Sequence, residues 1–170
     1  MSMYNATVPQ LSQMLDNLTG WMDEAQAYAE ERGFEVAVLL DQRLHPDMFS
    51  LRRQIQSSCD NVKLACARLG GVEAPRHEDG EQTWDELKAR IAEVGAFVQG
   101  LDPEGFEGAA KRELTPGFLR GQAVLGHHYL NQFALPNLYF HLSMVYAILR
   151  ANGVKLGKMK FIGKMTTYTP

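Results

Sequence analysis

Apolar residues recur every three or four positions along four separate stretches of the chain, and this spacing is typical of amphipathic helices. These stretches cover about residues 7–32, 46–69, 84–99 and 136–150. Each is long enough to cross a small domain from end to end. The pattern therefore predicts an all-α protein, with four long helices packed into a single domain over residues 1–170.

Capping residues, prolines and glycines mark the expected ends of these helices. The first is expected to begin at 7–10, where a threonine and a glutamine flank a proline, and the second at 45–49, where Pro-Asp fits a first turn. A capping box at 83–86 starts the third helix. Pro136 either starts the fourth helix or kinks it. A connecting helical turn is expected within 34–44.

The long segment between the third and fourth helices, residues 102–121, is rich in glycine and proline. We expect an irregular crossover there, with a short extended piece at 111–114. The segment from 72 to 82 is also rich in turn-forming residues and is expected to be a loop. Two connections of this kind fit a helical bundle in which neighbouring helices are not all consecutive in the chain.

The fourth apolar stretch carries a histidine on its apolar face. At about 100° per residue, four side chains fall on one stripe of this helix: Asn137, His141, Met144 and Ile148. A histidine in this position is either a hydrogen-bonded core residue or part of a pocket floor. Asn137, one turn before His141, could supply one of the hydrogen bonds that a buried imidazole needs.

The second apolar stretch is bordered by polar side chains at helical spacing: Asp47, Gln54, Ser58 and Asn61. Two interpretations remain open. The stripe is either a helix edge that meets solvent, or it faces Asn137 and His141 across the bundle. The second interpretation predicts that Gln54 lies in contact with His141.

Composition and charge exclude some functions but do not name one. The chain is 45% hydrophobic and 22% charged, with a formal net charge of −3. This balance argues against nucleic acid or an anionic membrane as a partner, since both require a basic surface. No apolar run reaches the roughly 20 residues that span a bilayer, and the first residues do not resemble a signal peptide. We expect a cytoplasmic protein.

The two cysteines, Cys59 and Cys66, lie seven residues apart within the second predicted helix. A rise of 1.5 Å per residue separates them by roughly 10 Å, which is too far for a disulfide. A thiol-chemistry pair and a pair of small packed residues are both conceivable, and the second interpretation is favoured because free cysteines are usually buried.

Several short motifs resemble one branch of the DinB/YfiT-like superfamily of metalloenzymes. They occur in the same order and span nearly the whole chain: Pro46-Asp47-Met48-Phe49, Pro136-Asn137-Leu138-Tyr139-Phe140-His141, Ala147-Ile148-Leu149-Arg150, Asn152-Gly153-Val154 and Gly157-Lys158. The resemblance implies a four-helix bundle with up-down-down-up topology and a long crossover between helices 3 and 4. It also implies a homodimer.

The better-known members of this superfamily bind a divalent metal through one histidine on the second helix and a His-x-x-x-His pair on the fourth. In this chain, His141 matches the second histidine of the pair and Asn137 matches the first. The second-helix ligand would fall near Gln54 or Ser58. One imidazole with amide oxygens is a poor site for a transition metal. We therefore expect no metal cofactor, although Asp47 could join a weak divalent-metal site.

Two classes of function are consistent with these residues. The favoured one is a small-molecule-binding or dimeric bundle with a degenerate metal site, in which the pocket candidates are His141, Asn137, Gln54, Asp47 and Ser58. The alternative is a metal-dependent transferase or hydrolase of the DinB type, in which His141 acts as a base or as the only strong ligand. The expected partners are a small molecule and a second copy of the chain, with no nucleic acid and no membrane.

Overall fold

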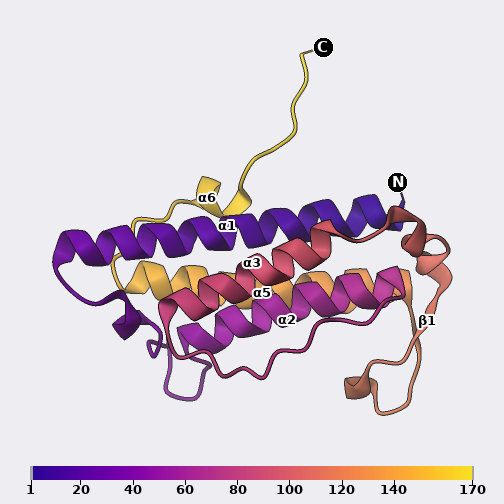
Figure 1. Ribbon diagram of the computed structural model, residues 1–170, viewed down its shortest axis with the longest axis horizontal. Helices are drawn as coiled ribbons and strands as arrows, with labels where there is room; N and C mark the ends of the chain where they lie inside the picture. Colours follow the sequence, from indigo (N-terminus) through magenta and orange to yellow (C-terminus); the bar gives the residue numbers. More distant parts are fainter. Residues whose placement is uncertain (1, 170) are drawn as a thin grey trace.

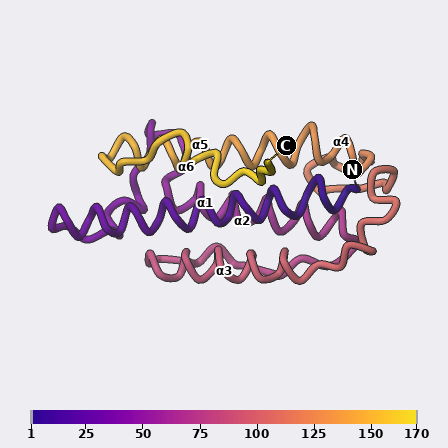
Figure 2. Tube along the Cα trace, turned by 90° about the horizontal axis from the view of Figure 1, so that it is seen from above, coloured from indigo at the N-terminus to yellow at the C-terminus, as the bar shows by residue number. Residues whose placement is uncertain are grey.

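Four long helices form an elongated bundle in the computed structural model, which describes residues 2–169 (Figure 1). They are α1 (Met3–Arg32), α2 (Leu51–Gly70), α3 (Trp84–Gln99) and α5 (Leu135–Ala151). Helices α1 and α5 run in one direction, while α2 and α3 run in the other, so the predicted up-down-down-up topology is confirmed. Figure 2 shows α3 and α5 on opposite sides of the α1–α2 pair. Helix α2 packs against both α3 and α5.

Shorter elements lie between these helices and after α5, and most of them lie between α3 and α5 at one end of the bundle (Figure 1). They are η1 (Val36–Leu39), η2 (Pro103–Phe106), η3 (Ala109–Lys111), β1 (Glu113–Leu114), η4 (Gly117–Leu119), β2 (Val124–Leu125), α4 (Gly126–Tyr129), η5 (Leu130–Ala134) and α6 (Lys158–Ile162). Strands β1 and β2 are antiparallel, with Glu113 opposite Leu125 and Leu114 opposite Val124. The expected extended piece within 111–114 corresponds to β1.

Helix α1 begins four residues before the predicted start. The Ser2 side chain accepts a hydrogen bond from the backbone N–H of Asn5 at 3.1 Å and caps the helix. Pro9 therefore lies inside α1 rather than in its first turn. The additional turn is held by Tyr4, whose ring packs edge-to-face on Phe106 with centroids 5.3 Å apart.

Helix α2 begins later than predicted, at Leu51 instead of within 45–49. Ser50 is extended and precedes the first helical residue. The segment before it is a turn in which the backbone N–H of Met48 donates to the carbonyl of His45 at 3.0 Å. The prediction that Asp47 stabilises a helix N-terminus was therefore wrong, because a local turn competes with the helix at these residues.

The other predicted helix boundaries need less correction. The capping box of α3 is present, with Thr83 and Glu86 each bonding to the backbone of the other. Before α5, the helical path already begins at Gly126, and η5 is a π-helical turn just ahead of Pro136. Proline cannot donate a backbone hydrogen bond, and the wider turn accommodates that missing donor.

Buried polar side chains are concentrated on α2. Its apolar residues, such as Leu51, Ile55 and Val62, form the core with α1, α3 and α5. The same helix also buries several polar side chains, namely Gln54, Gln56, Ser58, Asn61 and Lys63. Helices α3 and α5 cover α2, and the loop before α3 covers Gln56 and Lys63, which bond to Glu81 and His77 of that loop. Each of them needs a hydrogen-bond partner within the fold or from a ligand.

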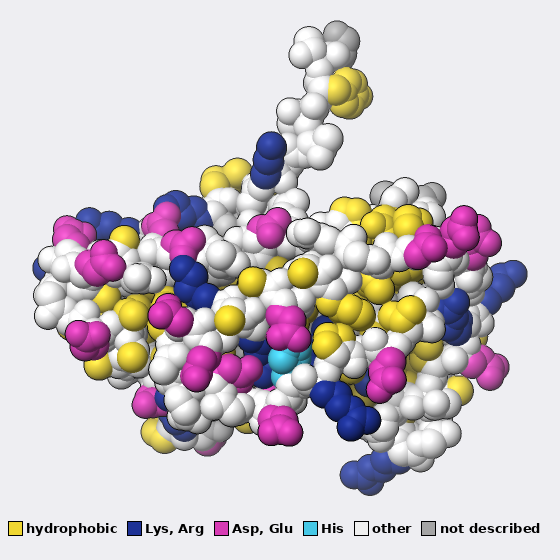
Figure 3. Space-filling model, viewed as in Figure 1, with side chains coloured by type: hydrophobic (Ala, Val, Ile, Leu, Met, Phe, Trp, Pro, Cys, Tyr) yellow, Lys and Arg dark blue, Asp and Glu magenta, His cyan; other side chains and the backbone are white. Residues whose placement is uncertain are grey.

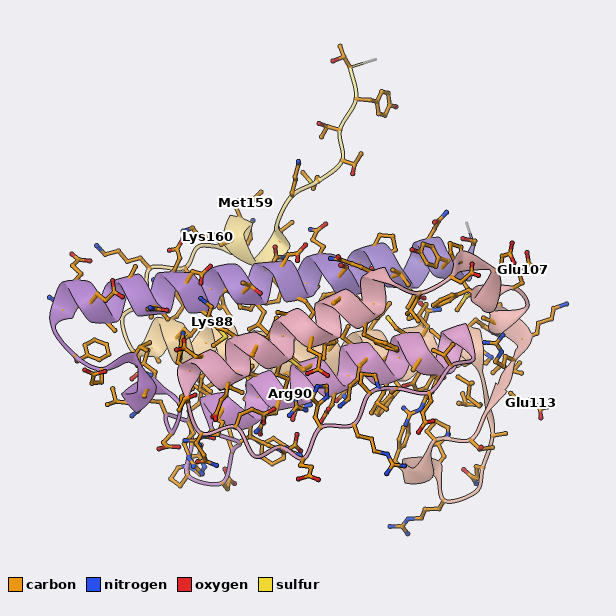
Figure 4. All side chains as sticks on the ribbon, in the orientation of Figure 1. Lys88, Arg90, Glu107, Glu113, Met159 and Lys160 are labelled. Atoms are coloured by element: carbon orange, nitrogen blue, oxygen red, sulfur yellow. The ribbon has the colours of Figure 1, made fainter. Side chains whose placement is uncertain are left out.

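Arg90 on α3 joins three parts of the chain through buried ion pairs. Its guanidinium lies 2.6 Å from the carboxylates of Asp60 and Asp79 and 2.9 Å from that of Glu81. Burial alone would lower the pKa of Arg90, but these acidic partners outweigh it and raise the pKa. Acidic, basic and histidine side chains cluster on this face of the molecule in Figure 3, and Arg90 is labelled in Figure 4. The network fixes α2 against α3 and the preceding loop.

Within residues 2–169, no helix is both long enough and apolar enough to cross a membrane.

Candidate functional site

His141 lies at the edge of the buried face of α5, not at its centre. The most buried side chains of this helix near it are Leu138, Leu142 and Val145. His141 is half-buried, and Phe140 beside it is 52% exposed. The predicted stripe was thus rotated by a fraction of a turn relative to the true core face. This position leaves part of the imidazole facing away from the core.

The predicted contact between His141 and Gln54 is confirmed. The Nδ1 atom of His141 lies 2.8 Å from the Oε1 atom of Gln54, whose side chain is buried in α2. With an amide oxygen as its partner, Nδ1 carries the proton, and Nε2 then holds a lone pair. One turn later on α2, the hydroxyl of Ser58 donates to the backbone carbonyl of Gln54 at 2.8 Å.

The surroundings of His141 favour its neutral form. Burial lowers the pKa of the imidazole, and the nearby positive charge of Arg53 lowers it further. Both effects disfavour the imidazolium, because a charged ring would lose hydration and would lie near another positive charge. At neutral pH His141 is therefore an uncharged imidazole whose Nε2 atom accepts hydrogen bonds.

His141 and Asn137 line one pocket of about 230 Å³ between α2 and α5. The residues around it come from α2, η4, α4, η5 and α5, and they are Ser57, Asp60, Asn61, Leu64, Arg68, Phe118, Tyr129, Phe133, Asn137 and His141. Asn137 and His141, which the sequence pattern assigned to one stripe of the fourth helix, both line this pocket. Gln54 and Ser58 do not line the pocket; Gln54 orients its histidine, and Ser58 bonds to the backbone of α2.

Asn61 leaves a buried acceptor without a partner. This residue is 7% exposed, and its Oδ1 atom is buried with no hydrogen-bond partner in the described part of the chain. A buried amide oxygen without a donor costs free energy in the ligand-free protein. Asn61 lines the same pocket as His141, but its buried Oδ1 atom is not accessible from the pocket.

Arg68 provides the cation of this pocket. Its guanidinium donates to the hydroxyl of Tyr129 at 2.7 Å and lies 5.6 Å from the centre of that ring. Asp60, which also lines the pocket, is instead paired with Arg90 at 2.6 Å and with Lys63 at 2.8 Å. Within residues 2–169, Arg68 has no carboxylate at ion-pair distance, so its charge is available to a ligand.

Aromatic rings form one wall of the pocket. Phe118 from η4 stacks on Phe133 from η5, with ring centroids 4.1 Å apart. Phe133 stacks in turn on Tyr129, with centroids 5.8 Å apart. Phe118 remains 48% exposed, so this wall reaches the surface of the molecule. The crossover thus contributes directly to the site.

Asp47 lies outside this site. Its carboxylate pairs with the imidazole of His45 at 2.5 Å on an exposed turn. The candidate role for Asp47 depended on a second helix that includes residue 47, and α2 begins only at Leu51.

The two cysteines also do not line the pocket. Burial raises the pKa of both Cys59 and Cys66 to about 12, so their side chains remain thiols.

Sequence reasoning did not identify Arg68, Tyr129, Phe118 or Phe133 as site residues. One signal was available on α2, where Ser57, Asn61, Leu64 and Arg68 recur at spacings of four, three and four. That spacing indicates a shared face but not which helix covers it. Phe118 belongs to the crossover, and Tyr129 and Phe133 belong to α4 and η5, which follow it. The periodic pattern does not encode the path of this segment.

The donor set at the implied metal position does not fit a transition metal. Among residues 2–169, no three histidine, cysteine or acidic side chains form a group that could hold a metal ion. At the positions implied by the resemblance, only His141 offers an imidazole. The amide oxygen of Gln54 is occupied by that ring, and Ser58 is bonded to the backbone.

Comparisons with known proteins place the chain in a family. A family model described as a domain of unknown function, DUF1993, matches residues 3–162. The crystal structure of a DinB family member protein from Shewanella denitrificans is 41% identical, with a TM-score of 0.93, and the match covers 98% of this chain and 95% of that one. A search of curated proteins gave no match. The resemblance drawn from the motifs is confirmed, and the chain belongs to the DUF1993 family and has the fold of the DinB family.

Proposed function

We propose that this protein binds a small molecule in the pocket between α2 and α5, with His141 as a recognition residue. The observation that carries the proposal is the hydrogen bond between His141 and Gln54. It satisfies Nδ1 inside the protein and leaves Nε2, on the other side of the ring, for the pocket. A neutral imidazole held in one orientation is a precise hydrogen-bonding group for a ligand.

A purely structural role for His141 is less well supported. A core histidine normally has hydrogen-bond partners for both ring nitrogens. In the described part of the chain, Nε2 of His141 has no such partner, while Nδ1 does. The same pocket is also lined by Arg68, whose guanidinium has no carboxylate at ion-pair distance among residues 2–169. A free imidazole nitrogen and a free cation on one cavity favour binding over packing.

Histidine side-chain NMR tests this proposal. The protein is labelled with ¹⁵N-histidine and screened against a library of fragments, including aromatic acids, amides and alcohols. We expect some fragments to shift the ring signals of His141 and to lose affinity in His141→Gln. A matched control is His128→Gln, which alters an exposed histidine bonded to Gln132. If no fragment shifts the His141 signals, the proposal is wrong.

Catalysis by His141 is the second candidate function. Its support is the same neutral Nε2 atom, which has the protonation state of a general base at neutral pH. The ring orientation set by Gln54 would direct this base toward a bound hydrolase or transferase substrate. Mass spectrometry of each bound fragment after incubation distinguishes the two candidates: unchanged fragments support binding alone, while a product absent with His141→Gln supports an enzyme.

The homodimer implied by the family resemblance stays a prediction. Sedimentation velocity over a range of protein concentrations tests it, because a reversible dimer changes its sedimentation coefficient with concentration. The small-molecule proposal does not depend on the result, since all residues named above belong to one chain.

A further inference from the structure

We infer that two copies of this chain exchange the segments that follow α6, each copy binding the other's segment in a groove beside α1. This segment, residues 164–169, is here named the arm. Three features carry the inference: an open groove, an arm that points away from its own bundle, and a match in chemistry between the two. The groove is a different surface from the His141 pocket, so the inference goes beyond the proposed function and does not depend on it.

The groove lies between α1, α5 and the end of α6 and has a volume of about 540 Å³. This volume is in the range of pockets that bind ligands. Its apolar walls include Pro9, Met14, Tyr139 and Ile162. Lys164 is the only charged residue that lines it. The groove therefore suits an uncharged segment with apolar side chains.

Helix α1 already binds the backbone of one segment beside this groove. The side chains of Gln13, Asn17 and Trp21, one turn apart, donate at 2.9, 2.9 and 3.0 Å to three consecutive carbonyls of α6, those of residues 162, 161 and 160. Such carbonyls at a helix end lack a partner within their own helix. Gln10 lies one turn before Gln13, and both line the groove. The same kind of side chain is thus available to the backbone of a further segment.

Gly163 determines the direction in which the arm leaves α1. Its φ of 79° favours glycine, and a Cβ atom there would lie 2.4 Å from the Oδ1 atom of Asn17. The chain is therefore packed closely against α1 at this residue, and the arm then leads away from the bundle (Figures 1 and 4). Met165 and Tyr168 of the arm are 64% and 89% exposed. Apolar groups gathered on a projecting segment indicate an interaction site.

A second copy of the chain is the occupant that fits this groove. After Lys164 the arm reads Met-Thr-Thr-Tyr-Thr, which has no charge and two large apolar side chains. The arm begins at the edge of its own groove and leads away from it. A two-fold axis close to Gly163 therefore lets each copy place its arm in the groove of the other, and exchange of identical segments is a low-cost route to a closed dimer.

Sedimentation equilibrium of the full chain tests the role of Tyr168. We expect a reversible dimer whose dissociation constant rises at least about tenfold in Tyr168→Ser, because the ring is the largest apolar group of the arm. The matched control is Phe49→Ser, which removes another exposed aromatic ring, one that does not line the groove. This control should change the dissociation constant by less than about twofold. Tyr168 lies outside every helix, so its replacement leaves the bundle intact.

A nitroxide spin label attached to Thr167→Cys shows where the arm lies. The native Cys59 and Cys66 are buried, so they do not take up the label. Spin-labelled protein without ¹⁵N is mixed with ¹⁵N-labelled parent protein, and any broadening of amide signals then arises between two chains. We expect the signals of Gln10 and Gln13 in the ¹⁵N-labelled copy to broaden.

Several outcomes would overturn the exchange. A protein that stays monomeric at all concentrations would contradict it. A dimer that Tyr168→Ser leaves unchanged, or broadening at residues outside the groove, would mean that two copies meet through another surface. Broadening that occurs only when the spin label and ¹⁵N are in the same chain would place the arm in its own groove. None of these results affects the proposed function, which is followed separately through the ring signals of His141.

Discussion

The imidazole of His141 and the amide of Gln54 are 2.8 Å apart, although 87 positions separate them in the chain. This hydrogen bond crosses from α5 to α2 at the base of the pocket. It determines which nitrogen of the histidine is protonated and which is available to a ligand.

The pH dependence of stability should report the buried state of His141. Its pKa is lowered in the folded protein, so the unfolded chain binds a proton more readily. Stability contributed by the neutral ring is complete above the unfolded pKa of about 6.5 and is lost as pH falls through the lowered folded pKa. We expect His141→Gln to flatten the stability curve below about pH 6.5. Urea unfolding between pH 7.5 and 5 measures the free energy of unfolding of both proteins. If its slope against pH is the same in His141→Gln and the parent protein, this prediction is wrong.

Replacing Gln54 by glutamate should reverse the direction in which the pKa of His141 is shifted. Gln54→Glu places a carboxylate next to Nδ1, and this negative charge favours the imidazolium. We expect the pKa of His141 to rise relative to the parent protein, as followed by ¹⁵N chemical shifts during a pH titration. A pKa that stays lowered would mean that residue 54 does not contact the ring in solution.

Asn61→Leu should stabilise the ligand-free protein. The substitution removes a buried acceptor that has no partner among residues 2–169 and replaces it with an apolar group of similar length. We expect a gain of about 1 kcal/mol, which corresponds to a rise in melting temperature of about 2 to 4 °C. Differential scanning calorimetry measures this change. A clear loss of stability would mean that Asn61 makes a stabilising hydrogen bond, and it would contradict this prediction.

Arg90→Met should strongly destabilise the bundle. It leaves the carboxylates of Asp60, Asp79 and Glu81 without their shared buried cation, and we expect a loss of about 3 kcal/mol in urea unfolding at pH 7. The matched control is Lys88→Met on the same helix, whose exposed pair with Asp23 should contribute less than about 1 kcal/mol. Similar losses in both variants would contradict the prediction.

The effect of Arg90→Met on stability should depend on pH. Burial alone would raise the pKa of Asp79, but the hydrogen bonds and charges of Arg53 and Arg90 outweigh burial and lower it. Burial would also raise the pKa of Glu81, but hydrogen bonds from its own backbone N–H, from Gln56 and from Arg90 outweigh burial and lower it. Their stabilising effect is therefore present above the ordinary carboxyl pKa and is lost as pH falls through the lowered values. The difference between Arg90→Met and the parent should shrink below about pH 4.

Local sequence patterns determined the helices and one half of the site. The apolar spacing indicated all four long helices, and the Thr83–Glu86 capping box located the start of α3 correctly. The stripe on the fourth helix singled out His141, and the polar stripe on the second led to Gln54. These features are readable because helix periodicity and capping depend on residues only a few positions apart.

Only the tertiary structure decided which of these side chains meet. Asp47 was separated from the site because a local turn displaces the start of α2 to Leu51. Arg68 and Phe118 joined it because the crossover returns beside α2. Such contacts depend on how helices pack and where a long connection runs, and neither leaves a periodic signal in the sequence. The sequence by itself therefore determined the bundle and its histidine, while packing determined the pocket.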